Sequence, residues 1–240
     1  MTINFTQLFK ESWNFVRNQR QFFMTFVLIF VGVTWLLTFI APEQPRAMVS
    51  DNVADDISML VQKIVPFFIS AWGLVAIHHI SQGKNLNLQT TAIQTLRRFL
   101  GFFLLSMLCL LPLGLGILNG VYAIVQNQPP SFFAMVLIIM GIFVFVRFCL
   151  APIAYLMGDC HLKNALPNML KLTQRRGSTL FLYCLITHFC FPLLIFQLTL
   201  FVMNTVSLLL VFIVSAIINT FSLVLTYRFY TIFTQQANTK

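Results

Sequence analysis

Long runs of apolar residues alternate with short polar segments along the chain, and this pattern is the first feature that predicts its fold. A helix needs about 20 mainly apolar residues to cross the hydrocarbon core of a membrane. Six runs qualify: Gln21–Ala41, Ile64–Ile80, Phe99–Val125, Phe132–Met157, Thr179–Met203 and Val206–Thr226. A transmembrane β-barrel would instead show alternating segments of about ten residues. The pattern therefore predicts an all-α, multi-pass membrane protein with six transmembrane helices.

Amphipathic stretches precede the first, third and fifth of these runs. Each places apolar residues on one helical face and polar or basic residues on the other. The three apolar stripes are Phe5, Leu8, Phe9, Trp13 and Val16; Ile93 and Leu96; and Leu162, Leu166 and Met169. Such helices lie naturally at an anionic cytoplasmic leaflet. We therefore expect three cytoplasmic interfacial helices, the third with a kink or a late start at Pro167.

Three arginines recur at a constant interval. Arg20, Arg98 and Arg176 are 78 residues apart, and each closes a polar segment and opens a long apolar run. One interpretation is a single integral membrane domain, residues 1–240, built of three units of an interfacial helix and a two-span hairpin, about 1–80, 81–160 and 161–240. The alternative is that any six-span protein with evenly spaced loops shows the same rhythm.

The composition narrows the class of protein further. Of 240 residues, 58% are hydrophobic and 9% are charged, whereas soluble domains carry roughly 25% charged residues. Six acidic and fifteen basic residues cannot give a chain of this length a polar surface. We therefore exclude a soluble globular protein, a disordered chain and a disulfide scaffold.

The basic residues are divided unequally between the segments that connect the runs. Arg46 and the border residue Lys63 lie on one side of the predicted membrane, and Arg147 lies within the fourth run. The other side has twelve basic residues in four segments: Lys10, Arg17, Arg20, Lys84, Arg97, Arg98, Lys163, Lys171, Arg175, Arg176, Arg228 and Lys240. Because cytoplasmic loops carry the excess of Lys and Arg, both termini are predicted to be cytoplasmic. The first run is then an uncleaved signal anchor.

The first loop on the opposite side, Pro42–Gln62, is acidic. Ser50 or Asp51 is suited to cap a helix that begins near Val53. The loop is interpreted as a solvated segment that its charge keeps out of the membrane, and a role in cation binding or partner docking is the alternative. It holds four of the six acidic residues: Glu43, Asp51, Asp55 and Asp56.

Arg147 lies near the middle of the fourth run, where a charge is costly and indicates function by default. No Asp or Glu occurs in any of the six runs. Pro152 frees the carbonyl group of Phe148. Arg147 is interpreted either as a snorkelling residue that locks the helices together or as a contact for an anionic headgroup or solute. Its possible partners are the Phe148 carbonyl, Asn119, Gln197 and Asn219.

The residues that carry chemistry are otherwise few. His188, in the fifth run, is either a proton relay or a histidine bonded to a neighbouring helix. The five cysteines show no CxxC spacing, and Asp159-Cys160-His161 is too compact to converge on one metal ion. There are no paired carboxylates and no HExxH, GxSxG or P-loop motif. We therefore expect no enzyme activity, no cofactor and no metal site.

Short motifs distributed over the whole chain carry a resemblance to a known family. They are Asn14-Phe15-Val16-Arg17-Asn18-Gln19 with Phe23-Met24-Thr25, Leu150-Ala151-Pro152 followed by Asp159, and Tyr227-Arg228-Phe229-Tyr230. In these the sequence resembles the YciC family of uncharacterised bacterial inner-membrane proteins. The Arg147 to Asp159 pattern is also similar to the membrane domain attached to some glycerophosphodiester phosphodiesterases. The resemblance implies a multi-pass protein of a bacterial inner membrane and no particular activity.

These observations favour a non-enzymatic envelope scaffold that interacts with lipid. The expected partner is the phospholipid bilayer, with anionic headgroups at the cytoplasmic face, rather than nucleic acid. The alternative is a small transporter or channel for an anionic solute or lipid. The candidate lipid or anion contacts are Arg147, Arg17, Arg20, Arg97, Arg98, Arg175 and Arg176.

Overall fold

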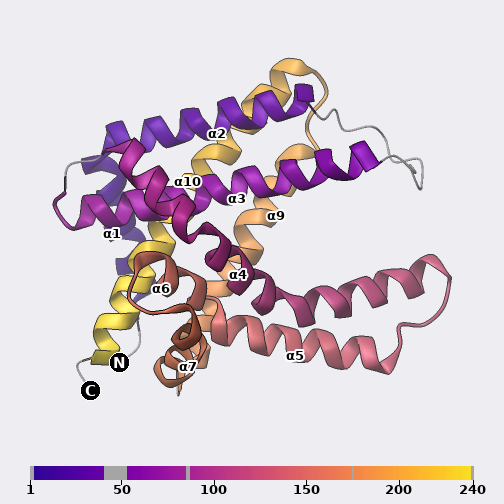
Figure 1. The fold of residues 1–240 in the computed structure, drawn as a ribbon. Coiled ribbons are helices and arrows are strands. Elements are labelled where there is room, and N and C mark those ends of the chain that lie inside the picture. Colours follow the sequence, from indigo (N-terminus) through magenta and orange to yellow (C-terminus); the bar gives the residue numbers. More distant parts are fainter. Residues whose placement is uncertain (1–2, 41–52, 85–86, 175, 239–240) are drawn as a thin grey trace. The chain divides into compact units, whose positions relative to one another are not determined.

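The computed structural model describes residues 3–40, 53–84, 87–174 and 176–238, and no β-strand occurs in these ranges. The predicted helix cap at Ser50 or Asp51 lies outside them. The helical elements are α1 (Phe5–Asn18), α2 (Arg20–Ile40), α3 (Val53–Ser81), α4 (Leu88–Val125), α5 (Phe132–Phe148), α6 (Ala151–Met157), α7 (Leu162–Thr173), α8 (Gly177–Cys184), the π-helical turn η1 (Leu185–Cys190), α9 (Phe191–Thr199) and α10 (Thr205–Asn238) (Figure 1).

Six helical stretches are long and apolar enough to cross a membrane, which confirms the all-α class and the six predicted spans. The third begins at Leu88 rather than Phe99, because the amphipathic stretch before Arg97 forms the first turns of α4. The spans are Arg20–Phe39, Leu60–Ser81, Leu88–Val125, Phe132–Met157, Gly177–Thr199 and Thr205–Gln236.

Prolines interrupt two of these spans. The fourth span is divided where α5 ends at Phe148 and α6 begins with Pro152 in its first turn. Pro152 has no N–H to donate to the Phe148 carbonyl, so the α-helical hydrogen-bond ladder stops there. In the fifth span the π-helical turn comes directly before α9, which has Pro192 in its first turn. Neither interruption is visible from hydrophobicity alone.

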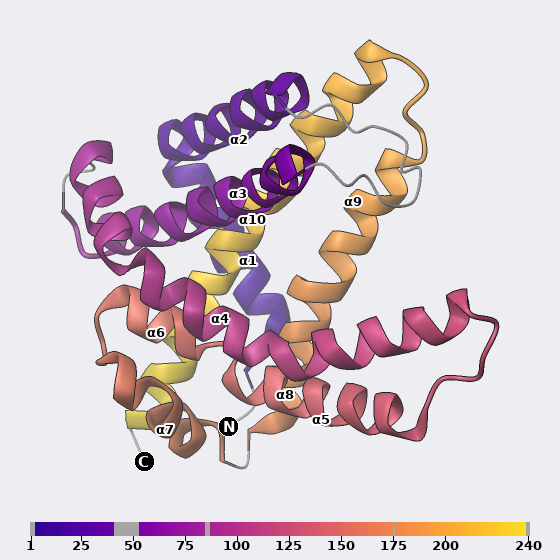
Figure 2. The same cartoon turned by 45° about the vertical axis from the view of Figure 1, so that its right-hand side comes forward.

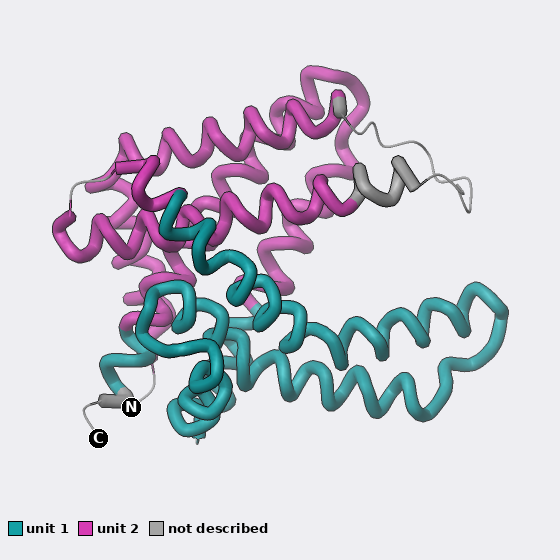
Figure 3. The backbone as a smooth tube through the Cα atoms, viewed as in Figure 1, with its two compact units in different colours: residues 1–2, 93–185, 232–240 teal, residues 3–92, 186–231 magenta. Residues whose placement is uncertain are grey.

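The chain divides into two compact units (Figure 3). One comprises residues 3–92 and 186–231, and it includes α1, α2, α3, α9 and most of α10. The other comprises residues 93–185 and 232–240, and it includes most of α4, all of α5 to α8 and the end of α10. The predicted division into three hairpins stays a prediction.

Aromatic contacts hold α1 against α10 in the first of these units. The Phe5 and Phe229 rings stack with centroids 6.1 Å apart, and the Phe9 and Phe221 rings stack at 6.2 Å. The buried side chains of α1 are Leu8, Ser12, Phe15 and Val16. Trp13, which the predicted apolar stripe includes, is 63% exposed. The buried face of α1 is therefore rotated from the predicted stripe toward Phe15.

In the second unit, α4 and α5 lie side by side in both views (Figures 1 and 2). Gly141 allows this approach, since a Cβ atom there would lie 2.5 Å from the Cα of Leu113. Small residues at such positions let membrane helices pack closely. Leu104, Leu118 and Ile139 are each more than half exposed. So much exposed apolar surface suits lipid rather than water.

Candidate functional site

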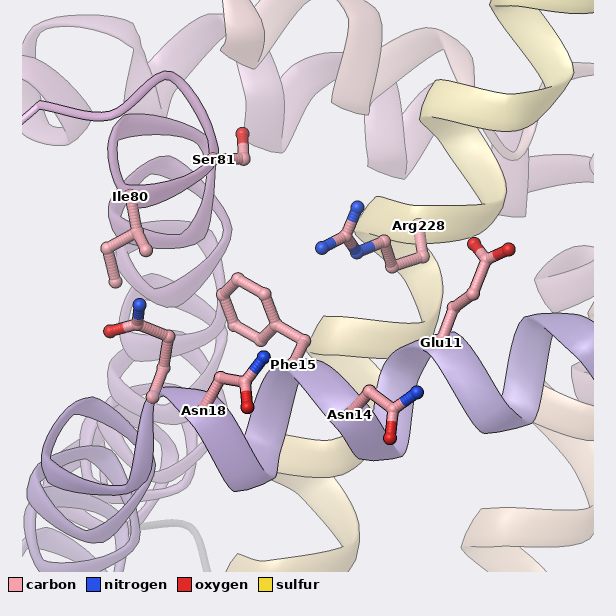
Figure 4. A pocket seen from close by; sticks show the side chains of 8 residues that line it. Glu11, Asn14, Phe15, Asn18, Ile80, Ser81 and Arg228 are labelled. Carbon is pink, nitrogen blue, oxygen red and sulfur yellow. The ribbon is translucent and has the colours of Figure 1, made fainter.

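A pocket of about 390 Å³, with polar and apolar side chains in its lining, lies between α1, the end of α3 and α10 (Figure 4). It belongs entirely to the unit of residues 3–92 and 186–231. Glu11, Asn14 and Asn18 are three and four residues apart, which puts them on one face of α1. The polar face of α1 therefore lines this pocket. The lining side chains are Glu11, Asn14, Phe15, Asn18, Gln19, Ile80, Ser81 and Arg228.

Arg228 is the cation of this pocket. Its Cζ atom lies 5.3 Å from the centroid of the buried Phe15 ring. Its Nε atom is buried and has no hydrogen-bond partner among the residues that the structure describes. A buried donor without an acceptor costs free energy, on the order of 1–3 kcal/mol. The ring attracts the guanidinium, and the Nη groups are the donors that a ligand in the pocket would meet.

A chain of hydrogen bonds fixes the wall of the pocket where α3 meets α10. Ser81 Oγ donates to the His78 carbonyl at 2.8 Å and is also bonded to the Tyr227 hydroxyl. The Tyr227 hydroxyl therefore donates to Ser81, and it accepts from His78 Nδ1 at 3.2 Å. Gln82 Nε2 donates to His78 Nε2 at 2.8 Å. Because an amide nitrogen can only donate, these two bonds fit the tautomer in which Nδ1 of His78 carries the hydrogen.

The sequence-predicted arginines fall into different environments. Arg17, Arg20 and Arg97 are exposed, and Arg20 Nε donates to the Arg17 carbonyl at the end of α1, at 3.1 Å. Arg175 lies outside the described residues. None of these four lines the pocket. The exposed three are free to meet groups outside the protein.

Arg98 and Arg176 are half-buried and bind backbone at helix ends. Arg98 Nη1 donates to the carbonyls of Tyr155 and Leu156, in the last turn of α6, at 3.2 and 3.5 Å. Gly158, with a φ of 90°, ends this helix, and a Cβ there would lie 2.5 Å from Arg98 Nη1. A cation at the C-terminus of a helix satisfies carbonyls that lack an intrahelical donor.

Arg176 makes the equivalent contacts at the end of α10. Its Nη1 and Nη2 donate to the carbonyls of Phe233 and Gln236 at 3.2 and 2.8 Å. Both half-buried arginines thus have a structural role that their sequence context does not reveal. Their predicted contact with lipid stays a prediction.

Arg147 lies within the fourth span, in the last turn of α5, which ends one residue later. Its Cζ lies 5.3 Å from the centroid of the Phe143 ring. Two of the four suggested partners have other bonds: the Phe148 carbonyl accepts from Cys109 Sγ at 3.7 Å, and Asn119 Oδ1 accepts from Ser131 Oγ at 3.2 Å. Arg147 is half-buried beside an aromatic ring rather than paired with an acceptor in the described part of the chain.

The described ranges contain no group of three or more His, Cys, Asp or Glu side chains that could hold a metal ion. The five cysteines are free thiols. Burial raises the pKa of the Cys160 thiol, the charge of Asp159 raises this pKa further, and Arg98 opposes the shift. His188 lies in the π-helical turn of the fifth span.

Sequence reasoning missed the pocket and the part that Arg228 plays in it. The sequence places Arg228 among the basic residues that set the orientation and in one motif of the family resemblance, but assigns it no contact. A signal was present, since Glu11, Asn14 and Asn18 form a polar row and α10 is unbroken through Arg228. The sequence does not show that these two features meet.

The chain is similar over its length to an uncharacterized curated protein. Over 241 residues the chain is 36% identical to an uncharacterized protein of Haemophilus influenzae, with 97% of this chain and 99% of that protein covered. No family model matches the chain, and no solved structure matches it.

Proposed function

The chain belongs to the family of this uncharacterized Haemophilus influenzae protein, and from that premise we propose that it is a non-enzymatic, multi-pass scaffold of a bacterial inner membrane. It binds anionic phospholipid headgroups at the cytoplasmic face, where both termini lie. Three interfacial helices lie at that face: α1, the first turns of α4, and α7. We propose that this family is the YciC family that the sequence resembles.

The observation that carries this proposal is the exposure of Arg17, Arg20 and Arg97 on the side with the excess of basic residues. The side chains of Arg17 and Arg97 have no hydrogen-bond or ion-pair partner among residues whose placement is described. Guanidinium groups that are not held by protein acceptors are suited to phosphate. Each basic residue near an anionic surface contributes about 1 kcal/mol to lipid binding.

The test replaces Arg17, Arg20 and Arg97 together with Gln. The purified protein is exchanged into an equal mixture of phosphatidylglycerol and phosphatidylcholine, and the lipids that it retains are quantified. We expect the triple variant to lower the enrichment of phosphatidylglycerol at least tenfold. The matched control removes two cations from the opposite side, Arg46→Gln with Lys63→Gln, and should leave the enrichment unchanged. Equal enrichment in all three proteins contradicts the proposal.

A small transporter or channel for an anionic solute or lipid is the second candidate. Arg147 in the fourth span and the π-helical turn in the fifth favour it, because interrupted spans with an intramembrane charge often line transport paths. The protein in liposomes should then release a trapped anion or move an anionic lipid between leaflets. An Arg147→Gln variant should lose this movement, and liposomes that show none count against the transporter.

A further inference from the structure

We propose that the pocket around Arg228 binds an aminophosphodiester group, with the phosphate on Arg228 and the primary amine on Glu11. This chemistry occurs as the headgroup of a phosphatidylethanolamine and as soluble glycerophosphoethanolamine. The proposal concerns a built pocket and does not depend on the exposed arginines of the previous section.

The phosphate position follows from the unused donors of Arg228. Its buried Nε has no acceptor within the described residues, and its Cζ is held 5.3 Å from the centroid of the Phe15 ring. The two Nη groups carry the other N–H donors of this guanidinium, and such a pair of donors matches two oxygens of a phosphate. The amides of Asn14 and Asn18, on the neighbouring face of α1, add further donors.

The amine position follows from Glu11, which lines the same pocket. Its Oε1 accepts from Gln7 Nε2 at 2.9 Å, and no other partner of its carboxylate lies in the described part of the chain. Figure 4 shows that the carboxylate of Glu11 points away from the guanidinium of Arg228, so the two opposite charges line one pocket without pairing. Glu11 would repel a simple anion, whereas it attracts the ammonium end of a zwitterion.

The size and position of the pocket fit a headgroup. A volume of about 390 Å³ is in the range of small-ligand sites. Ile80 and Ser81 end α3 and its candidate span, which would put this wall of the pocket where a span meets the headgroup region, whereas Arg228 lies within the candidate span of α10. The sequence predicts that this end is the cytoplasmic one.

The test compares three lipids that share a phosphodiester and differ in the group beyond it. The full chain is placed in bilayer nanodiscs that contain phosphatidylethanolamine, phosphatidylcholine and phosphatidylglycerol in equal amounts, and the tightly retained lipid is identified by native mass spectrometry. We expect phosphatidylethanolamine to be preferred over phosphatidylcholine, since a quaternary ammonium has no N–H to donate to Glu11. Equal retention of the three lipids overturns the proposal.

Two pocket variants separate the two ends of the ligand. Glu11→Gln should lower the preference for phosphatidylethanolamine over phosphatidylcholine about tenfold, because it removes a charge-assisted hydrogen bond. Arg228→Gln should lower retention of both lipids alike. Lys10→Gln, an exposed change on α1 outside the pocket, is the matched control and should change neither.

If Arg228→Gln does not fold, Glu11→Gln still tests the proposal, because it removes no core contact and changes only the group that would bind the amine. An unchanged lipid preference in Glu11→Gln contradicts the proposal. Glycerophosphoethanolamine, added to the protein in detergent, separates the two sources: if it binds as tightly as the lipid does, the ligand is soluble. The Arg17, Arg20 and Arg97 triple variant should keep the preference, so failure of the surface proposal is distinguishable from failure of this one.

Discussion

The Arg176 guanidinium holds Phe233 at two points: Nη1 donates to its carbonyl at 3.2 Å, and Cζ lies 5.5 Å from the centroid of its ring. Arg98 Nη1 donates to the Tyr155 carbonyl at the same distance of 3.2 Å. The two arginines are 78 residues apart, and so are their acceptors. One contact therefore recurs at the interval that the arginines show in the sequence, whereas the division into three hairpins stays a prediction.

Replacing Arg176 with Gln should destabilise the protein. The change removes two hydrogen bonds to helix-end carbonyls and the contact with the Phe233 ring, at a cost of about 2–3 kcal/mol. The measurement is the apparent melting temperature in detergent. Arg97→Gln is the control, because the Arg97 side chain is exposed and should change the melting temperature little. Equal melting temperatures for the two variants would show that the carbonyl contacts do not stabilise the fold.

Gly141→Ala should weaken the packing of α4 against α5. The new Cβ would lie 2.5 Å from backbone atoms of Leu113, so the helices must separate, at a cost of about 1–3 kcal/mol. Gly114→Ala is the matched control, since no atom lies within 4 Å of a Cβ built there. Thermal unfolding of both variants checks this prediction, which fails if Gly114→Ala is the more damaging change.

Tyr227→Phe should loosen the connection between α3 and α10. It removes the hydroxyl that links Ser81 to His78, and we expect a loss of about 1–2 kcal/mol. Tyr122→Phe, at a position that is 66% exposed, makes the same chemical change without that link. Chemical denaturation of the two variants in detergent gives the comparison. No difference between them would mean that the hydrogen-bond chain contributes nothing to stability.

Cys160 reports the orientation of the loop before α7. A membrane-impermeant maleimide should label it in inverted vesicles and not in right-side-out vesicles, because the loop is predicted to be cytoplasmic. Burial raises the pKa of this thiol, so the thiolate is scarce near neutral pH and labelling should accelerate as the pH rises. Cys160→Ser gives the background from the four cysteines within the spans. Labelling from the outer side would reverse the predicted topology.

The six spans could be predicted because hydrophobicity is a property of each segment alone. The roles of Arg98 and Arg176 could not, because their acceptors are backbone carbonyls at helix ends 57 residues away in the chain. Every residue has a backbone carbonyl group, so no residue type marks the carbonyls that will accept a hydrogen bond. The sequence therefore predicts seven arginines as similar lipid contacts, whereas the structure separates exposed from half-buried ones.

The pocket was beyond prediction for a related reason. Glu11 and Arg228 come from opposite ends of the chain. Both lie outside the predicted apolar runs, where a charged residue is expected and indicates no site. Only the packing of α1 against α10, through Phe5 with Phe229 and Phe9 with Phe221, brings them to one cavity.

The π-helical turn Leu185–Cys190 has a consequence for how this span tolerates changes in length. Such a turn accommodates one residue more than a regular α-helix does. Deleting one residue from the turn would therefore give a regular α-helix in which the side chains of α9 keep their faces, because only the extra residue is lost. A deletion within α9 itself would instead turn every following side chain by about 100°, which exchanges the faces of the rest of the span while leaving its hydrophobic length almost unchanged.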